Sequence, residues 1–299
     1  MTLKQLEAFY WAASCSTFAM AAERVHLSVS SLSKRITELE VSLGQSLFDR
    51  AGHRAELTEA GTRLLPLAGA LLQQADRLRQ DIGVVTGLRG RCHIGAGELS
   101  ALTWLPRLVV AVGQAHPQLD VTVHVDIGEA LADRLDRGEL DVAVIAGQSR
   151  RSALQSTPLA QAEFAWCARS DVAAGLTVMD AAALKLHPLV TLPLGSGVTP
   201  IIDAWLLRAG VQPQRRLVCN QWGAIVGLLA QGGGIGLLPV GWAKALEARG
   251  VLVRLHSPYP LDALDYALHT RRNDLRPLVE TLRAMTVQAV DFTADSGVF

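Results

Sequence analysis

The segment 19–47 constrains the fold of this chain most, because it predicts two helices joined by a tight turn. Ser28 is expected to begin the second helix, since a serine hydroxyl accepts a hydrogen bond from a free backbone N–H of a first helical turn. The apolar residues that recur at the spacing of one buried face of this helix are Leu32, Ile36, Leu39 and Leu43. The residues expected to pack the preceding helix are Phe18, Ala21, Ala22 and Val25.

The opposite face of the second helix combines small polar side chains with positive charge. Its residues are Val29, Ser30, Ser33, Lys34 and Thr37, with Arg35 alongside. Small side chains let a polyanion approach closely, hydroxyls reach phosphates or base edges, and cations neutralise phosphate. This pattern indicates a helix-turn-helix whose second helix enters a major groove. An ordinary helix pair with a solvated outer face has the same periodicity, so the period alone does not decide.

Further residues match a known family in order and spacing. They are Leu6, Phe9, Thr17-Phe18, Ala21-Ala22, His26-Leu27-Ser28, Ser33, Ile36, Leu39-Glu40, Leu43-Gly44, Leu47-Phe48, Arg50, Leu57-Thr58 and Ala60-Gly61. On these residues, segment 3–61 resembles the DNA-binding domain of the LysR-type transcriptional regulators. Val29 departs from the family, which usually has Gln there. Gln hydrogen-bonds a base edge whereas Val offers only an apolar contact, which puts the family's usual half-site preference in doubt.

A small β-wing is expected after the helix pair, as two short extended pieces around the turn at Gly52. Its basic residues Arg50, His53 and Arg54 are expected to contact backbone phosphate or a minor groove. The alternative is a solvated loop that happens to be basic. Net charge does not decide between phosphate contact and a solvated loop. The whole chain has a formal net charge of zero, and residues 1–57 carry six Lys/Arg against six Asp/Glu. Binding to DNA would therefore depend on local placement of cations and on two copies acting together.

A long helix is expected from a cap at Thr58 to about Leu88, with Pro66 kinking or breaking it. Its apolar residues Leu64, Ala68, Leu71, Ala75, Leu78, Ile82 and Val85 recur with a period of 3.5, typical of a seam that faces another helix. Such a helix needs a partner, and the simplest partner is a second copy. A homodimer would place two recognition helices on the half-sites of an interrupted palindrome in double-stranded DNA.

After a hinge at 88–90, strands alternate with helices, which predicts an α/β region with a parallel sheet. The matching residues there are Leu105-Pro106, Pro117, Gly138-Glu139-Leu140-Asp141, His187-Pro188-Leu189, Gly232 to Gly236 and Leu238-Pro239. Residues 90–299 resemble the effector domain of the same family, which implies two periplasmic-binding-protein-like lobes with the tail returning to the first. The expected division is a winged helix-turn-helix at 1–58, a linker helix at 59–89, lobe I at 90–159 and 262–299, and lobe II at 160–261.

A small-molecule effector is expected between the lobes, because ligands of α/β sheets bind at the carboxyl ends of strands and near helix N-termini. Loops 97–100 and 196–199 fit, with Thr199 as a helix cap and Pro200 at the first helical position. In the family the corresponding loops line the effector pocket. The candidate effector residues are Ser100, Thr103, Gln148, Ser149, Ser196, Thr199 and Trp222. They suit a small anion such as a carboxylate, but an inward Glu98 would repel one, and the alternative is that they only cap helices.

Other classes of protein find little support. The cysteines Cys15, Cys92, Cys167 and Cys219 form no CxxC pair, which fits a reducing compartment; Cys167 and Cys219 are either a redox pair or small buried hydrophobes. The chain begins directly with a helix and has no apolar run of about 18 residues, so a cytoplasmic location is expected. No catalytic or cofactor motif is present, so no cofactor and no enzyme activity are expected.

We therefore predict a dimeric or tetrameric transcription regulator; the alternative is a small-molecule-binding α/β protein whose N-terminal helices only dimerise.

Overall fold

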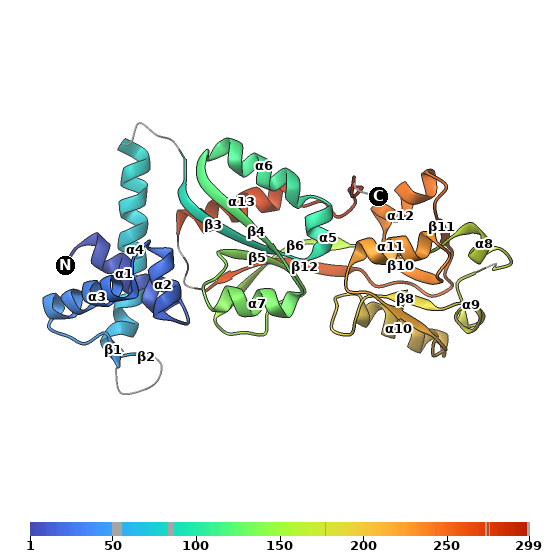
Figure 1. The fold of residues 1–299 in the computed structure, drawn as a ribbon, viewed down its shortest axis with the longest axis horizontal. Helices are drawn as coiled ribbons and strands as arrows, with labels where there is room; N and C mark the ends of the chain where they lie inside the picture. Colours follow the sequence, from blue (N-terminus) through green and yellow to red (C-terminus); the bar gives the residue numbers. More distant parts are fainter. Residues whose placement is uncertain (50–55, 83–86, 177, 273, 275, 298–299) are drawn as a thin grey trace.

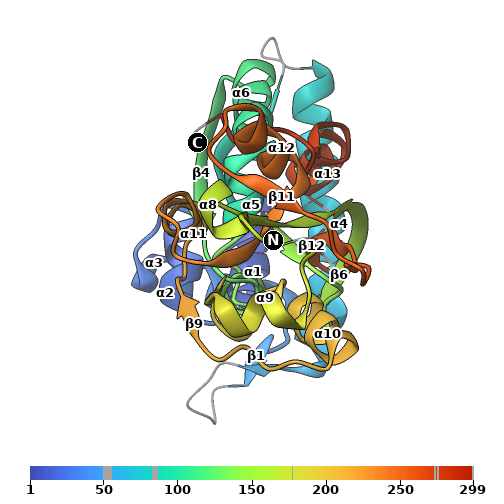
Figure 2. The ribbon, with the colours of Figure 1, turned by 90° about the vertical axis from the view of Figure 1, so that its right-hand side faces the viewer.

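The structure is a computed structural model, which describes residues 1–49, 56–82, 87–176, 178–272, 274 and 276–297. Three parts lie in a row along the longest axis: an N-terminal helical unit and two α/β lobes (Figure 1). The helix α4 (Glu59–Ile82) stands across this axis, as the view along the axis also shows (Figure 2). Such an arrangement separates the candidate DNA-binding surface from the lobe–lobe junction by the length of the first lobe.

The N-terminal unit packs three helices and a two-stranded ribbon against the first half of α4. Its other elements are α1 (Leu3–Ser14), α2 (Phe18–Arg24), α3 (Val29–Leu43), β1 (Phe48–Asp49) and β2 (Glu56–Leu57). A capping box between Thr2 and Gln5 begins α1, and the Thr17 hydroxyl caps α2. Phe48 lies between the rings of Phe9 and Phe18, with ring centroids 5.7 and 5.5 Å away. One apolar core therefore holds the ribbon and the helix pair together.

The long helix α4 differs from the sequence expectation in three ways. It is helical over Glu59–Ile82 and no longer helical at Leu88, while residues 83–86 lie outside the described residues. It also runs through Pro66 without a break, since one proline removes only one hydrogen bond of the ladder. Leu64 and Ala68 pack into the core of their own unit, so the predicted seam does not face a second copy throughout. The large apolar residues that α4 exposes are Leu67, Leu71 and Leu78, at 60, 41 and 62%.

The first lobe is built on a five-stranded sheet in the order β4-β3-β5-β12-β6. Its strands are β3 (Arg89–Ala96), β4 (Gln118–Val125), β5 (Val142–Ala146), β6 (Leu154–Ala162) and β12 (Leu264–Arg271). The first three are parallel, and β12 is antiparallel to both of its neighbours. Its helices are α5 (Glu98–Leu102), α6 (Leu105–Ala115), α7 (Gly128–Asp136) and α13 (Pro277–Ala289). Figure 1 shows α6 and α13 on one face of the sheet and α7 on the other.

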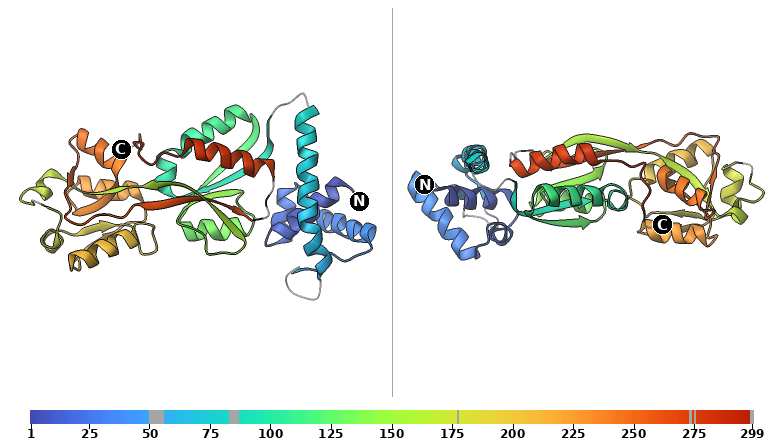
Figure 3. Two further views of the ribbon diagram at one scale, coloured as in Figure 1. Left: turned by 180° about the vertical axis from the view of Figure 1, so that it is seen from behind. Right: turned by 90° about the horizontal axis from the view of Figure 1, so that it is seen from above.

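The second lobe repeats this plan with a sheet in the order β11-β7-β10-β8-β9. Its strands are β7 (Phe164–Ala168), β8 (Leu189–Thr191), β9 (Arg216–Val218), β10 (Ile235–Pro239) and β11 (Val253–Leu255). Its helices are α8 (Ser170–Ala173), α9 (Ala181–Leu186), α10 (Thr199–Ala209), α11 (Trp222–Ala230) and α12 (Val240–Ala248). The chain enters this lobe between β6 and β7 and leaves it between β11 and β12, so its tail returns to the first lobe (Figure 3).

Two local expectations for the α/β region are corrected. The predicted hinge at 88–90 is partly strand, because Arg89 and Gly90 pair with Gln118 and Leu119 in the sheet. The strand β6 runs to Ala162, past the predicted lobe boundary at 159. Pro106 stands at the start of a separate helix, since α5 ends at Leu102 and α6 begins one residue before the proline.

Candidate functional site

The candidate recognition helix α3 is fixed at both ends. Ser28 Oγ accepts a hydrogen bond from Ser31 N at 3.1 Å, so the predicted cap is confirmed. Gly44 ends the helix with a φ of 64°, which glycine adopts without steric cost. The residues of α3 buried against the rest of the unit are Leu32, Ile36 and Leu39, as predicted. Leu43, predicted to share this face, lies in the last turn and is exposed.

The outer face of α3 is a surface of short polar side chains and two cations. Val29, Ser30, Ser33, Lys34 and Thr37 are exposed, and Arg35 is half-buried. The Oγ atoms of Ser30 and Ser31 each lie 2.9 Å from Ser28 Oγ, which gathers three hydroxyls at the start of the helix. Within the described part of the chain, neither Lys34 nor Arg35 forms an ion pair, so both charges remain available to an external anion.

The predicted wing strands are present as an antiparallel pair in which Phe48 lies opposite Leu57. The Glu40 carboxylate accepts hydrogen bonds from Leu47 N at 2.8 Å and Phe48 N at 3.3 Å, which ties the wing to α3. The basic wing residues Arg50, His53 and Arg54 lie outside the described residues, and their contacts stay predictions.

Arg24, in the last turn of α2, makes its hydrogen bonds with the first lobe and not with the outer face of α3. Its Nη1 lies 3.1 Å from both carboxylate oxygens of Asp141, and its Nε and Nη2 donate to Gly138 O at 3.1 and 2.6 Å. Asp141 is fully buried and also accepts from His93 N at 2.8 Å and from Arg276 Nη2 at 2.8 Å. Burial favours a raised pKa for Asp141, but the guanidinium groups of Arg276 and Arg24 lower the pKa overall, so the group stays charged.

Aromatic and backbone contacts complete this junction between the N-terminal unit and the first lobe. The Trp11 ring has the guanidinium carbon of Arg24 5.0 Å from its centroid and that of Arg276 4.6 Å away. Gly138 has a φ of 76°, and a Cβ there would lie 2.9 Å from Ser14 O, so a larger residue would separate the two parts. Sequence reasoning missed this junction, because residues 117 positions apart carry no local signal of contact.

A cavity of about 320 Å³ opens beside this junction, between the N-terminal unit and the first lobe. It is lined by Tyr10, Ser14, Arg271 and Asp274 among others. Arg271 donates to Leu135 O and Leu140 O and pairs with Asp274, so its guanidinium is already engaged. The cavity contains none of the residues expected to bind an effector.

The predicted effector residues of the first lobe lie at the start of α5 and after β5. Ser100 is fully buried and its Oγ has no hydrogen-bond partner among the described residues, whereas the Thr103 hydroxyl donates to Leu99 O at 2.7 Å. Gln148 is exposed, and Ser149 Oγ accepts from Arg151 N within its own loop. Of these four residues, Ser100 is thus the one whose buried polar group is left unpaired.

The predicted effector loop of the second lobe meets the first lobe at a glycine. A Cβ built on Gly197 would lie 3.2 Å from Ala146 Cβ at the end of β5. Thr199 does not cap α10 as predicted: it is the first helical residue, after the N-cap Val198. Its hydroxyl donates to Pro193 O at 3.3 Å and lies 3.0 Å from Ser196 Oγ, so these two predicted residues are brought together within the loop.

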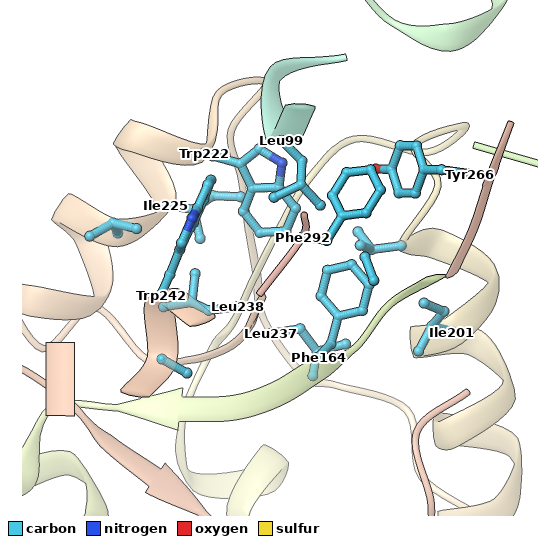
Figure 4. Packing of buried hydrophobic residues seen from close by; sticks show 14 of the residues in the cluster. Leu99, Phe164, Ile201, Trp222, Ile225, Leu237, Leu238, Trp242, Tyr266 and Phe292 are labelled. Carbon is cyan, nitrogen blue, oxygen red and sulfur yellow. The ribbon is translucent and has the colours of Figure 1, made fainter. Parts of the chain in front are cut away.

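Trp222, the last predicted effector residue, is buried at the lobe–lobe junction. Its ring is stacked with Phe164, with centroids 6.3 Å apart, and meets Trp242 edge-on (Figure 4). Its backbone N–H donates to Glu98 Oε2 of the first lobe at 2.9 Å. The sequence indicated only that an inward Glu98 would repel an anionic effector. Its hydrogen bond to the second lobe could not be predicted, because it depends on how the two lobes are placed.

Cysteine and metal chemistry are limited in the described residues. All four cysteines are free; Cys167 is buried, which raises its pKa to about 12, and Cys219 is half-buried. The described ranges contain no group of three His, Cys, Asp or Glu side chains suited to a metal ion. Nor does any helix in them combine the length and apolar character needed to span a membrane.

Comparisons with known proteins agree along the whole chain. Residues 3–62 match the family model described as bacterial regulatory helix-turn-helix protein, lysR family, and residues 86–291 match the LysR substrate binding domain. The uncharacterized HTH-type transcriptional regulator YfeR of Shigella flexneri is 27% identical over 263 residues, covering 86% of this chain and 84% of that protein. A probable RuBisCO transcriptional regulator of Trieres chinensis is 36% identical, covering 49% of this chain and 48% of that protein. The crystal structure of ArgP from Mycobacterium tuberculosis shares the fold, with a TM-score of 0.67, 22% identity and coverage of 95% and 96%.

Proposed function

This chain belongs to the LysR family of transcriptional regulators, and from that membership we propose which of its surfaces carry out each part of the function. It is a DNA-binding regulator with an effector-binding domain, and its family consists of regulators that oligomerise, not of enzymes. The proposed division is a winged helix-turn-helix at 1–58, a linker at 59–88 that contains α4, and two effector lobes, 89–162 with 262–299 and 163–261, where the bounds at 89 and 162 follow strands β3 and β6.

The outer face of α3 enters the major groove, and the wing follows the backbone. The residues in contact with DNA are Ser28, Val29, Ser30, Ser33, Lys34, Arg35 and Thr37, with Arg50, His53 and Arg54 on the wing. The observation that carries this assignment is the exposed face of hydroxyls and unpaired cations on a capped helix. Hydroxyls and cations fix the register on phosphate, while Val29 adds an apolar contact that reads thymine methyl groups.

Two copies associate through α4, and pairs of such dimers form a tetramer. The exposed leucines Leu67, Leu71 and Leu78 lie on one stripe of this helix, and exposed leucines on a helix need a covering partner. A dimer presents two copies of α3 to the half-sites of an interrupted palindrome and doubles the phosphate contacts.

A small effector binds at the lobe–lobe junction, near Ser100, Thr103, Gln148, Ser149, Ser196, Thr199 and Trp222. An effector changes the regulator only by binding two conformations with different affinity. Because Arg24 ties α2 to Asp141 of the first lobe, a movement of that lobe also moves the helix pair. The contact between Arg24 and Asp141 therefore supports a direct mechanical route from the effector to α3.

Selection from random-sequence DNA, followed by footprinting of the selected sites, tests this function. We expect two protected half-sites about one helical turn apart, with affinity that falls as salt rises. If a folded dimer selects no sequence at low salt, the DNA-binding assignment fails. The remaining reading is then a small-molecule-binding α/β protein whose N-terminal helices only dimerise.

A further inference from the structure

A carboxylate of the first lobe caps a helix of the second lobe. Glu98 Oε2 accepts a hydrogen bond at 2.9 Å from the backbone N–H of Trp222, the first residue of the nine-residue helix α11. The N-cap residue of α11, Gln221, makes no side-chain capping bond. Free N–H groups at a helix N-terminus carry partial positive charge and bind anions. Glu98 therefore already occupies the place that an anionic group of a ligand would take at α11.

Apart from the N-terminus of α11, the charge of Glu98 has no partner among the described residues. The side chain is half-buried, and among the described residues it forms no ion pair and its Oε1 accepts no hydrogen bond. Two residues further along α5, Ser100 Oγ is fully buried and also unpaired. The Thr103 hydroxyl is satisfied by Leu99 O. Glu98 and Ser100, two positions apart on α5, lie on different faces of the helix, so the charge of Glu98 is the feature offered to a ligand that donates hydrogen bonds.

We propose that Glu98 determines the charge of the effector: a cationic group, in the simplest case a primary ammonium, binds Glu98 at the lobe–lobe junction. The proposal rests on the proposed function, namely that a small molecule binds between the lobes. It replaces the small anion expected from the loop sequences. A second carboxylate at α11 would meet the charge of Glu98 at close range or displace it from Trp222 N, and both outcomes weaken binding.

The apolar side of the same junction is a packed core. The ring of Trp222 is stacked with Phe164 at an interplanar angle of 17°, and Leu99 lies beside it (Figure 4). These three side chains are buried, so they hold the two lobes together beside Glu98. The ligand class therefore rests on the charge of Glu98.

The first test does not depend on the natural effector. Glu98→Ala opens the N-terminus of α11, whereas Glu98→Gln keeps an acceptor oxygen without the charge. We expect sodium acetate, compared with sodium chloride at equal ionic strength, to raise the melting temperature of Glu98→Ala by a few degrees and to leave the wild type unchanged. Asp126→Ala is the matched control, because the exposed Asp126 directly follows the neighbouring strand β4 and, among the described residues, its carboxylate accepts from Ile127 N alone. An acetate effect that is equal in Glu98→Ala and the wild type overturns the proposal.

The second test compares ligands of one skeleton and opposite charge. Benzylammonium and benzoate form one pair, and 1,4-diaminobutane and butanedioate form another, with binding to the full chain measured by calorimetry. We expect the amine of a pair to bind the wild type at least tenfold more tightly than the carboxylate, and Glu98→Gln to remove this preference. Tighter binding of a carboxylate to the wild type overturns the charge assignment and leaves effector binding intact. The proposed function fails by a different result, namely that the protein does not protect selected DNA in the footprint.

Discussion

Replacing Arg24 with methionine tests whether buried charge holds the N-terminal unit on the first lobe. Methionine keeps an unbranched apolar chain beside Trp11 and removes the four hydrogen bonds of the guanidinium, two to Asp141 and two to Gly138 O. Asp141 keeps Arg276 Nη2 at 2.8 Å and His93 N at 2.8 Å. The Asp141 carboxylate therefore loses one guanidinium partner but keeps a second guanidinium and a backbone hydrogen bond.

The size of the effect follows from burial. The Arg24 side chain is 11% exposed and that of Asp141 is fully buried, so solvent screens this pair little. Removing one partner of a buried ion pair costs about 3–5 kcal/mol, and the retained Arg276 places this case near the lower value of about 3 kcal/mol. At roughly 1.4 kcal/mol per factor of ten, the undocked population rises about 100-fold.

Cysteine alkylation reports this undocking at one position. Cys15 is buried at the junction, where a Cβ on Gly138 would lie 3.1 Å from its Sγ. We expect the rate of iodoacetamide modification at Cys15, followed peptide by peptide with mass spectrometry, to rise about 100-fold in Arg24→Met. Cys167, buried in the second lobe, is the internal reference, and Lys4→Met removes an exposed cation from the same unit as a control. An unchanged Cys15 rate in the folded variant would refute the reasoning, and equal rises at Cys15 and Cys167 would indicate general unfolding instead.

Four further outcomes are expected. Lys34→Ala should weaken binding to all DNA sequences and lower the slope of log affinity against log salt by about 2 in a dimer, since each phosphate contact contributes about 0.9. Val29→Gln should instead change the sequence preference in a binding selection; an unchanged preference would mean that another side of α3 faces the groove. Glutamate at both Leu71 and Leu78 should dissociate the dimer in sedimentation experiments, because it places charge on the exposed stripe of α4; a persistent dimer would place the interface elsewhere. Burial and the nearby Arg134 lower the pKa of His124, so the unfolded state binds more protons and the free energy of unfolding should fall as pH drops below about 6.5. His124→Asn should flatten this dependence in urea titrations, and an equal slope would contradict it.

Elements with local signals were predictable from the sequence. Ser28 marks a helix start by its own hydroxyl, and the buried face of α3 follows the predicted spacing of Leu32, Ile36 and Leu39. The strand β6 was missed because Pro158 interrupts its pattern. That proline is tolerated because β6 lies at the edge of its sheet, next to a register shift between Tyr266 and Ala267 of β12.

Periodicity also could not identify the partner of a helix face. The heptad spacing of α4 includes Leu64, which packs on its own unit, and Leu71, which is exposed, since one period suits an intramolecular and an intermolecular contact equally. The candidate effector site could likewise be predicted only where a local sequence pattern marks it. The loop of Ser196 was found from its helix-start chemistry, whereas the bond from Glu98 to Trp222 joins residues 124 positions apart and follows from the placement of two lobes.

The placement of Arg24 links the charge of the N-terminal unit to its need for a second copy. Residues 1–57 carry no net charge, and the structure removes one of their six cations from the surface by pairing Arg24 with Asp141. On α3 this leaves Lys34 and Arg35, which neutralise few phosphates in one copy, so affinity at physiological salt requires the contacts of two copies together. The distance between the two copies of α3 then depends on the first lobes to which the helix pairs are attached. Because Arg24 pairs with Asp141 and so fixes the helix pair to the first lobe, we propose that the effector domain controls the spacing of the two recognition helices in the dimer.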